Sequence, residues 1–473
     1  SMEDRNIYEN ISPLDHRYYI ANKEIFSKLS EYLSEEASIR YCLKVEIALL
    51  KTHINRHLDN FRHYIEVLVN LENKIDPDEV YREEEKTRHN IRALVNVINR
   101  KLPPELQPFV HLGATSADIL DTAVSLRIKD AFINVVQPLL IDVENELIRI
   151  CAIEAETPQV GRTHGQHAVP ITFGFALAEY VSRLGKSILE LKRLTGQLKG
   201  KLAGAVGAYN AMSLIVKDPE EIEKEVMSNL GLEPSEYSTQ LIEPEYLLRL
   251  LLEMNVAFGI LANLADDLRH LQRSEIGELK ESYTKEQVGS STMPQKRNPW
   301  NSEHIKSLWK AFAPRVLTFY MDQISEHQRD LTNSASSRFV ADYIAGFSAA
   351  AARMKQVLSS LYIDRKKMYA NLYLTKDMLL SEAAYILLSI SGIGDAHEKI
   401  KQITLACEKN GISLLEALGR EDNLWRAVTA RLAETPGLPA EDFFTKPELY
   451  RGKAVQKALA LAAKYKLLME EFS

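Results

Sequence analysis

The chain has 473 residues, of which 45% are hydrophobic and 26% are charged, and its formal net charge is −7. This length is enough for two to four domains with buried cores, so the composition argues against a disordered chain. An acidic balance provides no general basic field for nucleic acid, whereas a phosphorylated small molecule needs only a few arginines.

The cysteines and the apolar stretches indicate in which cellular compartment the protein is expected. Three cysteines lie far apart without any CxxC pair, which argues against a disulfide framework or a zinc site and fits a reducing cytoplasm. No apolar stretch reaches the about 18 residues of a membrane span, and the N-terminus lacks the pattern of a secretory signal. We therefore expect a cytoplasmic protein without a membrane partner.

Helical periodicity covers most of the chain. Residues 1–112 carry short, polar helical segments, and a longer pattern follows over residues 117–156, interrupted only by Pro138. The next helix is predicted to begin at Pro170, a residue suited to a first helical turn. Its apolar seam alternates between steps of four and three residues, at Leu177, Val181, Leu184, Ile188, Leu191, Thr195, Leu198 and Leu202. Such a repeat along a helix of about 45 Å requires partner helices of similar length.

Two further patterns supply those partners. Residues 245–280 repeat leucines at helical spacing, and residues 300–361 continue the helical pattern with a break near 332–334. Glycine and proline are sparse, and no period-2 alternation predicts a sheet. We predict an all-α fold with a long central helical bundle. Its three predicted domains are an N-terminal helical domain at 1–112, a central long-helix bundle at 113–363 and a C-terminal helical domain at 364–473.

A loop with catalytic potential is predicted at residues 289–299, which read Gly-Ser-Ser-Thr-Met-Pro-Gln-Lys-Arg-Asn-Pro. Two prolines, three hydroxyls and two cations between helical stretches are typical of a loop. Asn298 precedes Pro299 and favours extended backbone, so Lys296 and Asn298 can point the same way and bind one carboxylate. A solvated basic loop is the simpler alternative.

Two other segments place polar groups near predicted helix ends. His164 lies in Gly-Arg-Thr-His-Gly-Gln-His, between two long helices. Taken alone, such a histidine is more often a cap or a surface residue, and with His167 it could suggest a metal site, although no nearby carboxylate or cysteine completes one. Thr115 and Asp118 form a capping-box pattern at the start of the 117–156 helix, whose N–H groups can also bind an anion.

Together these segments resemble the shared regions of the fumarase/aspartase superfamily. Residues 289–299 are similar to its GSSxMPxKxNP loop, residues 163–166 to its THGQ string, and residues 111–118 to a region in which Thr115 and Ser116 bind substrate. The resemblance implies a three-domain, all-α fold whose central bundle forms a homotetrameric core, with active sites shared between subunits. It also implies removal of a proton next to a carboxylate, followed by loss of an amine or a hydroxyl, which usually releases fumarate.

The resemblance assigns roles within these segments. His164 is expected to be the general acid that protonates the departing nitrogen, and Ser290, the first serine of the loop, is expected to be the base. Lys296 and Asn298, with loop N–H groups, are expected to stabilise the doubly charged aci-carboxylate intermediate.

Further segments resemble the adenylosuccinate lyase branch of the superfamily. The opening Ser-Pro-Leu-Asp-His-Arg17-Tyr18 is similar to its SPLxxRY motif, from which Arg17 and Tyr18 carry over as substrate contacts. The string Thr-Arg88-His89-Asn90 is similar to a TRHD motif whose histidine reaches the active site. We therefore expect a catalytic role for His89 and substrate contacts from Arg88 and Asn90, although Asn90 replaces an aspartate.

The stretch His-Gln-Arg329-Asp-Leu-Thr-Asn-Ser334-Ala-Ser-Ser-Arg338 resembles the phosphate-binding stretch of the same branch. Arg329, Ser334 and Arg338 carry over, since guanidinium groups suit phosphate; Gln240 matches a substrate-binding glutamine. A continuous helix would place the two arginines about 180° apart, so we predict a break near 331–334. Beyond it, Ser334 and Arg338 would share a helix face, with Ser334 as a candidate cap.

The resemblance implies a carbon–nitrogen lyase that releases fumarate from succinylated nucleotides. The sequence has no Walker-type or Rossmann glycine pattern and no metal-ligand cluster, so we expect no cofactor and no metal, and the acidic balance predicts no nucleic-acid partner. Glu243 and His304 stand where many members have arginine. Argininosuccinate lyase is the nearest alternative because Met-Pro-Gln-Lys also suits it, but the phosphate-binding arginines weigh against it. A non-catalytic structural relative and a monomeric helical scaffold that binds proteins through its seam are alternatives from other classes.

Overall fold

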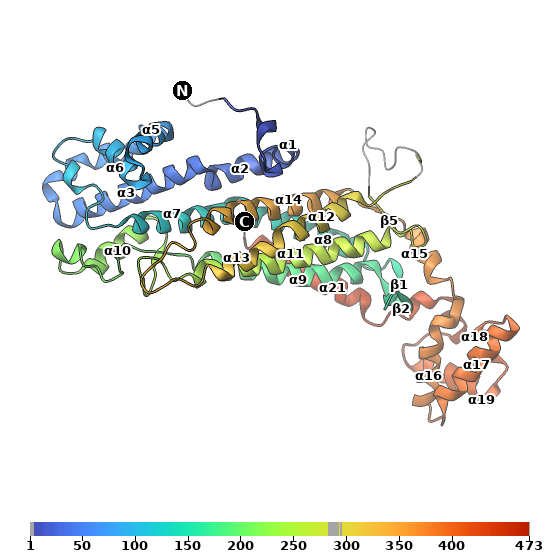
Figure 1. Ribbon diagram of the computed structural model, residues 1–473. Coiled ribbons are helices and arrows are strands. Elements are labelled where there is room, and N and C mark those ends of the chain that lie inside the picture. Colours follow the sequence, from blue (N-terminus) through green and yellow to red (C-terminus); the bar gives the residue numbers. More distant parts are fainter. Residues whose placement is uncertain (1–3, 282–292, 294–295, 473) are drawn as a thin grey trace. The chain divides into compact units, whose positions relative to one another are not determined.

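The computed structural model describes residues 4–281, 293 and 296–472 (Figure 1). Ser290 and most of the predicted catalytic loop lie outside the described residues. Helices make up most of the described chain, which confirms the predicted all-α class. The chain divides into two compact units, and the predicted three domains stay a prediction. The first unit contains Ser1–Ile141, Lys186–Ala262 and Ile305–Arg353, and the second contains Asp142–Gly185, Asn263–His304 and Met354–Ser473.

The first unit is assembled mainly from helices. The elements that lie wholly within it are η1 (Ile7–Glu9), η2 (Pro13–Asp15), α1 (Arg17–Ala21), α2 (Lys23–Leu33), α3 (Glu35–His57), η3 (Asp59–Tyr64), α4 (Ile65–Val69), η4 (Leu71–Asn73), α5 (Pro77–Thr87), α6 (Asn90–Arg100), η5 (Gln107–Phe109), α7 (Ser116–Ala131), η6 (Phe132–Val136), β3 (Lys199–Gly200), η7 (Met212–Leu214), α10 (Pro219–Asn229), β4 (Glu233–Pro234), η8 (Ala313–Arg315), α13 (Val316–Met321) and η9 (Ser336–Phe339). The α3 helix begins after Ser34, whose side chain accepts a hydrogen bond from the Ala37 N–H at 3.1 Å. It packs along α7 (Figure 1). Helices α5, α6 and α10 contribute buried apolar side chains to the same hydrophobic core.

The second unit combines a hairpin with a cluster of short helices. The elements that lie wholly within it are β1 (Pro158–Thr163), β2 (Gln166–Thr172), β5 (Leu279–Lys280), β6 (Tyr362–Ile363), α15 (Arg365–Leu372), η10 (Lys376–Leu380), α16 (Ser381–Ile390), α17 (Ala396–Asn410), α18 (Leu414–Gly419), α19 (Asp422–Glu434), α20 (Ala440–Thr445), η11 (Pro447–Leu449) and α21 (Ala454–Glu470). Helices α16 to α20 share a core that includes the fully buried Leu388 and Leu418. Its strands form two two-stranded sheets among the described residues, one of β1 with β2 and one of β5 with β6.

Five long helices of the described chain form the central bundle, and each contributes residues to both units. They are α8 (Gln137–Ile153), α9 (Phe173–Thr195), α11 (Glu245–Leu271), α12 (Trp300–Phe312) and α14 (Val340–Ser359). In the first unit, Ser187 of α9 donates a hydrogen bond to Glu253 of α11 at 2.9 Å, and Tyr343 of α14 donates one to Asn255 of α11 at 2.9 Å. Every residue of the predicted apolar seam is buried, which confirms the seam, although α9 ends before its last two leucines.

A π-helical turn, η6, joins α7 to α8 without a loop. The long helix predicted over residues 117–156 is therefore present as three successive helical segments, with Pro138 in the first turn of α8. Proline has no N–H to donate to the preceding turn, and it lies where the α-helical hydrogen-bond pattern is already interrupted by the π-helical turn.

The region around Pro170 differs from the prediction. Residues 158–172 form an antiparallel hairpin of β1 and β2, and Pro170 pairs with Val160 in it, so α9 begins at Phe173 instead. The fixed φ of proline suits a first helical turn and also an edge strand where no ladder N–H is required. The helix start predicted at Pro170 is therefore wrong, and a short sheet was missed.

The break predicted between the two phosphate-binding arginines is present, because residues 322–335 form no helix. The cap predicted for Ser334 is wrong: η9 begins two residues later and has no side-chain cap. Asp330 organises this segment, since its carboxylate accepts hydrogen bonds from the N–H of Thr332 at 2.9 Å and of Glu326 at 2.7 Å. These side-chain hydrogen bonds replace helical ones over residues 326–332, so this segment is a loop.

Within the described residues, α11 is long and apolar enough to cross a membrane by length and composition. Its most apolar window is 56% buried inside the structure. Such burial is typical of a core helix, which suits its place in the bundle.

Candidate active site

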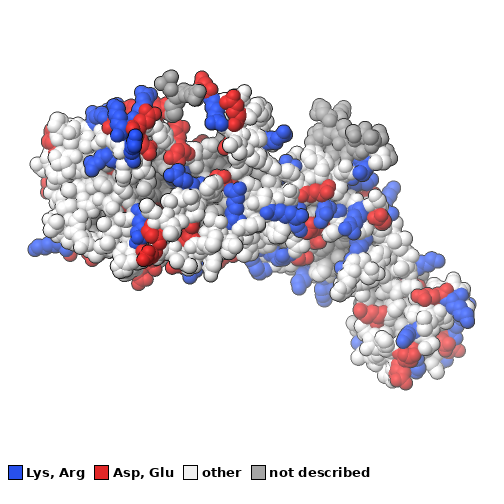
Figure 2. Space-filling view, viewed as in Figure 1, with Lys and Arg blue, Asp and Glu red and all other residues white. Residues whose placement is uncertain are grey.

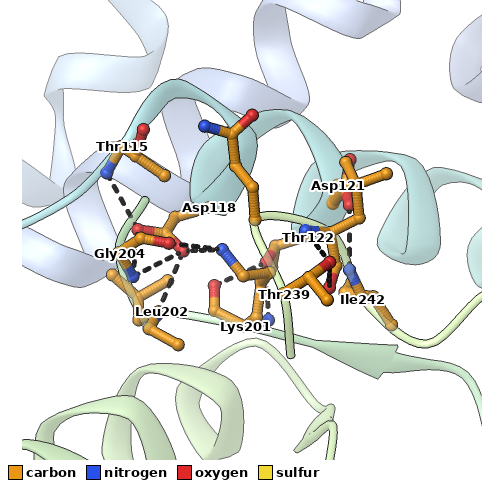
Figure 3. Close-up of polar contacts among 12 residues, drawn as sticks. Thr115, Asp118, Asp121, Thr122, Lys201, Leu202, Gly204, Thr239 and Ile242 are labelled. Carbon is orange, nitrogen blue, oxygen red and sulfur yellow. Dashed lines mark hydrogen bonds and ion pairs between the residues drawn. The ribbon is translucent and has the colours of Figure 1, made fainter. Parts of the chain in front are cut away.

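The first turn of α7 is tied to a buried polar network (Figure 3). The fully buried Asp118 accepts hydrogen bonds from the backbone N–H of Thr115 at 2.9 Å, Ala203 at 3.0 Å and Gly204 at 3.1 Å. Lys201, also fully buried, forms an ion pair with Asp118 and donates to the Gly204 carbonyl at 3.2 Å. The predicted cap of Asp118 on Thr115 is confirmed, and the same carboxylate also holds a second segment of the chain.

One turn farther along α7, Asp121 and Thr122 bind two neighbouring loops (Figure 3). The Thr122 hydroxyl accepts from the Lys201 N–H at 3.0 Å and donates to the Lys201 carbonyl at 3.1 Å, while Asp121 accepts from the Ile242 N–H at 3.1 Å. Burial raises the pKa of Asp121 to about 6, although the Ile242 hydrogen bond and the charges of Lys201 and Arg329 lower it. This pKa lies well above the usual range of an aspartate.

Gln240 and Arg329, which come from two separate predicted motifs, meet in the first unit. The Arg329 guanidinium donates a hydrogen bond to the side-chain oxygen of Gln240, and the Gln240 N–H donates to the Gln328 carbonyl at 3.2 Å. Glu243, one of the departures from the family pattern, accepts from the Tyr237 N–H at 3.2 Å. It therefore stabilises the loop that carries Gln240.

Histidines hold the loop that leads into α7. His53 is buried, and its Nε2 lies 2.8 Å from the Leu112 carbonyl, while its Nδ1 lies 2.8 Å from Nε2 of His57. Because a carbonyl only accepts, Nε2 of His53 carries the proton and Nδ1 accepts one from His57. Burial lowers the pKa of His53 to about 4, which keeps it neutral. Burial also opposes a charge on His111, but its contact with Glu46 at 2.7 Å raises the His111 pKa above its usual value.

Arg88, His89 and Asn90 form the junction between α5 and α6. Nδ1 of His89 accepts the Arg92 N–H at 3.1 Å, so His89 caps α6 and has Nε2 left for a ligand. Arg88 has a left-handed φ of 53° at the end of α5. The Asn90 side-chain oxygen accepts from the Ile91 N–H at 2.8 Å, a contact that an aspartate could also make.

His164 occupies the tip of the β1–β2 hairpin and is exposed. His164 and Gly165 have φ values of 55° and 71°, as in a two-residue type I′ hairpin loop. The hairpin is anchored by the buried Glu278, which accepts from Gln159 at 2.8 Å and pairs with Arg162 at 2.5 Å. The anchored hairpin thus holds the His164 imidazole in an exposed position.

Lys296 and Asn298 line one cavity of about 1050 Å³ in the second unit. The other positively charged lining residues are Arg269, Arg273, Lys280, Arg297 and Lys367, and the negatively charged ones are Glu275, Glu303 and Asp364. This excess of positive charge suits an anionic ligand. His164 does not line the cavity, and Ser290 lies outside the described residues.

The remaining predicted substrate-binding residues are Arg17, Tyr18, Ser116, Ser334 and Arg338. Arg17 is exposed at the start of α1, followed by Tyr18. Arg338 donates to the backbone carbonyl of Ser334 at 3.4 Å, so the structure does not join the two side chains directly. Ser116 begins α7 beside Thr115. Among the described residues, no group of three or more His, Cys, Asp or Glu side chains could hold a metal ion.

Sequence analysis did not identify Lys201 or Asp121. The available signal was a Lys-x-x-Gly-x-x-Gly pattern that starts at Lys201. Its glycines, Gly204 and Gly207, have φ values of 82° and 80°, which favour glycine. A Cβ on Gly207 would also lie 1.6 Å from the Ser238 carbonyl oxygen, so this loop passes directly against the backbone of residue 238.

Comparisons with known families and proteins agree with the sequence motifs. The family described as lyase matches residues 15–311, and the one described as adenylosuccinate lyase C-terminal matches residues 325–437. The adenylosuccinate lyase of Pyrococcus abyssi is 35% identical over 350 residues, which cover 73% of this chain and 75% of the relative. That of Methanocaldococcus jannaschii is 28% identical over 459 residues, which cover 94% of each chain.

Solved structures share the fold. The 3-carboxy-cis,cis-muconate lactonizing enzyme from Pseudomonas putida aligns with a TM-score of 0.79 at 24% identity, covering 96% of this chain and 99% of that one. Fumarate lyase from Mesorhizobium sp. BNC1 aligns with a TM-score of 0.77 at 21% identity, covering 92% and 97%. At these identities the likeness shows the fold alone.

Proposed function

Because this chain belongs to the adenylosuccinate lyases of the fumarase/aspartase superfamily, we propose that it cleaves adenylosuccinate to AMP and fumarate. We extend the proposal to the succinylated imidazole-carboxamide ribotide, which would give fumarate and the free ribotide. The contact between Arg329 and Gln240 carries the proposal, because it joins residues 89 positions apart, of which Arg329 matches the phosphate-binding stretch and Gln240 a substrate-binding glutamine. Arginine recognises phosphate with two parallel hydrogen bonds.

The proposed reaction begins at the succinyl carbon next to a carboxylate. Ser290 removes its proton, and the electron pair left behind moves into the carboxylate to form a doubly charged intermediate. Lys296 and Asn298 stabilise that charge, and the excess of positive charge around their cavity supports this role. When the intermediate collapses, the carbon–carbon double bond of fumarate forms, the carbon–nitrogen bond breaks, and His164 protonates the departing nitrogen. The exposed position of His164 on a fixed turn supports its role as the acid.

We propose that the nucleotide is bound mainly by groups of the first unit. Thr115 and Ser116 stand at the N-terminus of α7, whose N–H groups and positive dipole end attract anions. His89 would reach the substrate through Nε2, since its Nδ1 is occupied by the cap of α6. The other proposed contacts are Arg17, Tyr18, Arg88, Asn90, Gln240, Arg329, Ser334 and Arg338.

Members of this family are typically oligomeric, and we propose a homotetramer whose subunits share active sites. Apolar side chains on helices of the first unit support an interface: Leu252 and Val256 lie one turn apart on α11 and are 38% and 53% exposed. Leu317 and Met321, one turn apart on α13, are 60% and 56% exposed. Exposed apolar surface of this kind favours burial against another chain. Sedimentation tests the assembly, and a fully active monomer would refute shared sites.

We further propose a cytoplasmic location and small-molecule substrates. On the face drawn in Figure 2, basic and acidic side chains are interspersed, which suits a small anionic ligand better than a nucleic acid. The three cysteines are buried, free thiols, as fits a reducing compartment. The chemistry proposed for the side chains requires no cofactor.

The decisive assay offers the purified protein adenylosuccinate and argininosuccinate in separate reactions. We expect fumarate and AMP from adenylosuccinate and no comparable fumarate release from argininosuccinate. Faster fumarate release from argininosuccinate, or none from either substrate, would refute the proposed function.

A further inference from the structure

The ion pair between Lys201 and Asp118 is not explained by packing alone. Both side chains are fully buried. Removing two charges from water opposes folding, and apolar residues of similar volume often stabilise a core as well as a buried ion pair does. Both charged groups have further hydrogen-bond partners. The Asp118 carboxylate accepts from the N–H groups of Thr115, Ala203 and Gly204, and the Lys201 ammonium donates to the Gly204 carbonyl. What distinguishes it is therefore the set of segments that it joins.

The pair connects the start of α7 to the loop that follows Lys201. Thr115, which precedes the first residue of α7, is held by one oxygen of Asp118, while the loop is held by both oxygens and by the ammonium group. Thr122 adds two hydrogen bonds to the backbone of Lys201, at 3.0 and 3.1 Å. The loop therefore has little freedom to move relative to the helix N-terminus.

The same loop passes against the segment that carries Gln240. Gly207 has no room for a Cβ because the Ser238 carbonyl oxygen occupies that place. Asp121 binds the other end of this segment, because its carboxylate accepts a hydrogen bond from the Ile242 N–H at 3.1 Å (Figure 3). Gln240 lies between these two contacts and receives the hydrogen bond from Arg329.

We propose that the Lys201–Asp118 pair fixes the N-terminus of α7 and the Gln240–Arg329 contact relative to each other, so that both bind the same substrate molecule. This inference rests on the function proposed above. Lys201 and Asp118 are positioning residues, because side chains without exposed surface cannot touch a substrate. Their loss weakens nucleotide binding more than it slows the chemical step.

Kinetics of the full-length Lys201→Met variant test the proposal. We expect the KM for adenylosuccinate and the inhibition constant for AMP to rise about tenfold or more, while kcat changes less than about threefold, because hydrogen bonds that order the binding groups are lost. Thr122→Val keeps the ion pair and removes only the two hydroxyl hydrogen bonds. It is the milder variant should Lys201→Met fail to fold, and we expect a rise in KM of about threefold.

A double variant, Lys201→Met with Asp118→Asn, separates positioning from stability. It removes the charge that Asp118 would carry without its partner, so thermal stability should recover relative to Lys201→Met. The amide nitrogen of asparagine cannot accept the backbone N–H groups that the aspartate binds, so KM should stay high. Arg365→Met serves as the control: it removes the partner of Glu154, a carboxylate that is 1% exposed, and should lower stability without raising KM.

The outcomes separate this inference from the proposed function. If the unaltered protein releases no fumarate from adenylosuccinate, the proposed function fails. If the unaltered protein is active but KM and AMP inhibition stay within about twofold in Lys201→Met and Thr122→Val, the pair is structural only and the inference fails. Full recovery of KM in the double variant would also overturn the positioning role.

Discussion

Replacing Asp121 by asparagine should change how the stability of the protein depends on pH. Burial raises the pKa of Asp121 from 3.8 to about 6 in the folded protein. An acid with a higher pKa in the folded than in the unfolded chain binds its proton more tightly when folded. Its contribution to stability is therefore greatest below pH 3.8 and is lost as the pH rises through about 6.

The size of this effect follows from the two pKa values. The difference between 3.8 and about 6 corresponds to about 3 kcal/mol, at about 1.4 kcal/mol per pH unit. Asparagine cannot ionise and keeps an oxygen that accepts the Ile242 N–H. Asp121→Asn should therefore raise the free energy of unfolding at pH 7.5 by up to about 3 kcal/mol, and by less at pH 5.0.

Urea denaturation followed by circular dichroism at pH 5.0 and pH 7.5 measures the effect. Asp142→Asn is a matched control, because Asp142 forms an ion pair with Lys355 in which both side chains are about half exposed. The control should leave the pH dependence almost unchanged. A variant at position 121 that is less stable than the unaltered protein at pH 7.5, with the same pH dependence, would refute the argument from burial.

Three further substitutions have defined outcomes. His89→Asn should keep α6 intact, because asparagine also caps a helix, yet lower activity through loss of Nε2; unchanged turnover in the fumarate assay would remove His89 from the site. His164→Ala should reduce kcat by about 10² to 10⁴ while sedimentation stays unchanged, and near-normal kcat would end its role as the acid. Gly207→Ala should lower the free energy of unfolding by at least about 1 kcal/mol, since φ is 80° and the new Cβ meets Ser238; an unchanged urea midpoint would show that the loop can move aside.

Periodicity predicted the long helices because the burial of a helix face repeats locally along the chain. The seam from Leu177 to Leu202 is buried throughout, as its spacing indicated. The hairpin at 158–172 was missed because its turn residues, His164 and Gly165, are not the usual Asn-Gly or Asp-Gly pair. Pro170 added to the error, since its φ suits a strand edge as well as a helix start.

The candidate site was predictable motif by motif but not as an arrangement. Each predicted residue came from a short string, and such strings do not specify which segments lie together. Lys201 meets Asp118 across 83 positions of sequence, and neither periodicity nor charge spacing encodes such a contact. The cap predicted for Ser334 is absent because the following helix begins at Ser336, and a short string does not specify the residue at which a helix begins.

The π-helical turn between α7 and α8 sets how far α8 is rotated about the helix axis relative to α7. In a continuous α-helix, each residue turns the following ones by about 100°. A π-helical turn includes one residue more than an α-helical turn, so the five residues Phe132–Val136 rotate the chain about as far as four α-helical residues would. The extra residue is thus accommodated within this turn, and α8 keeps the rotational position in which Leu140, Val143 and Leu147 are buried. A deletion of one residue should therefore be tolerated better within this turn than within α8 itself, where it would rotate the following residues by about 100°.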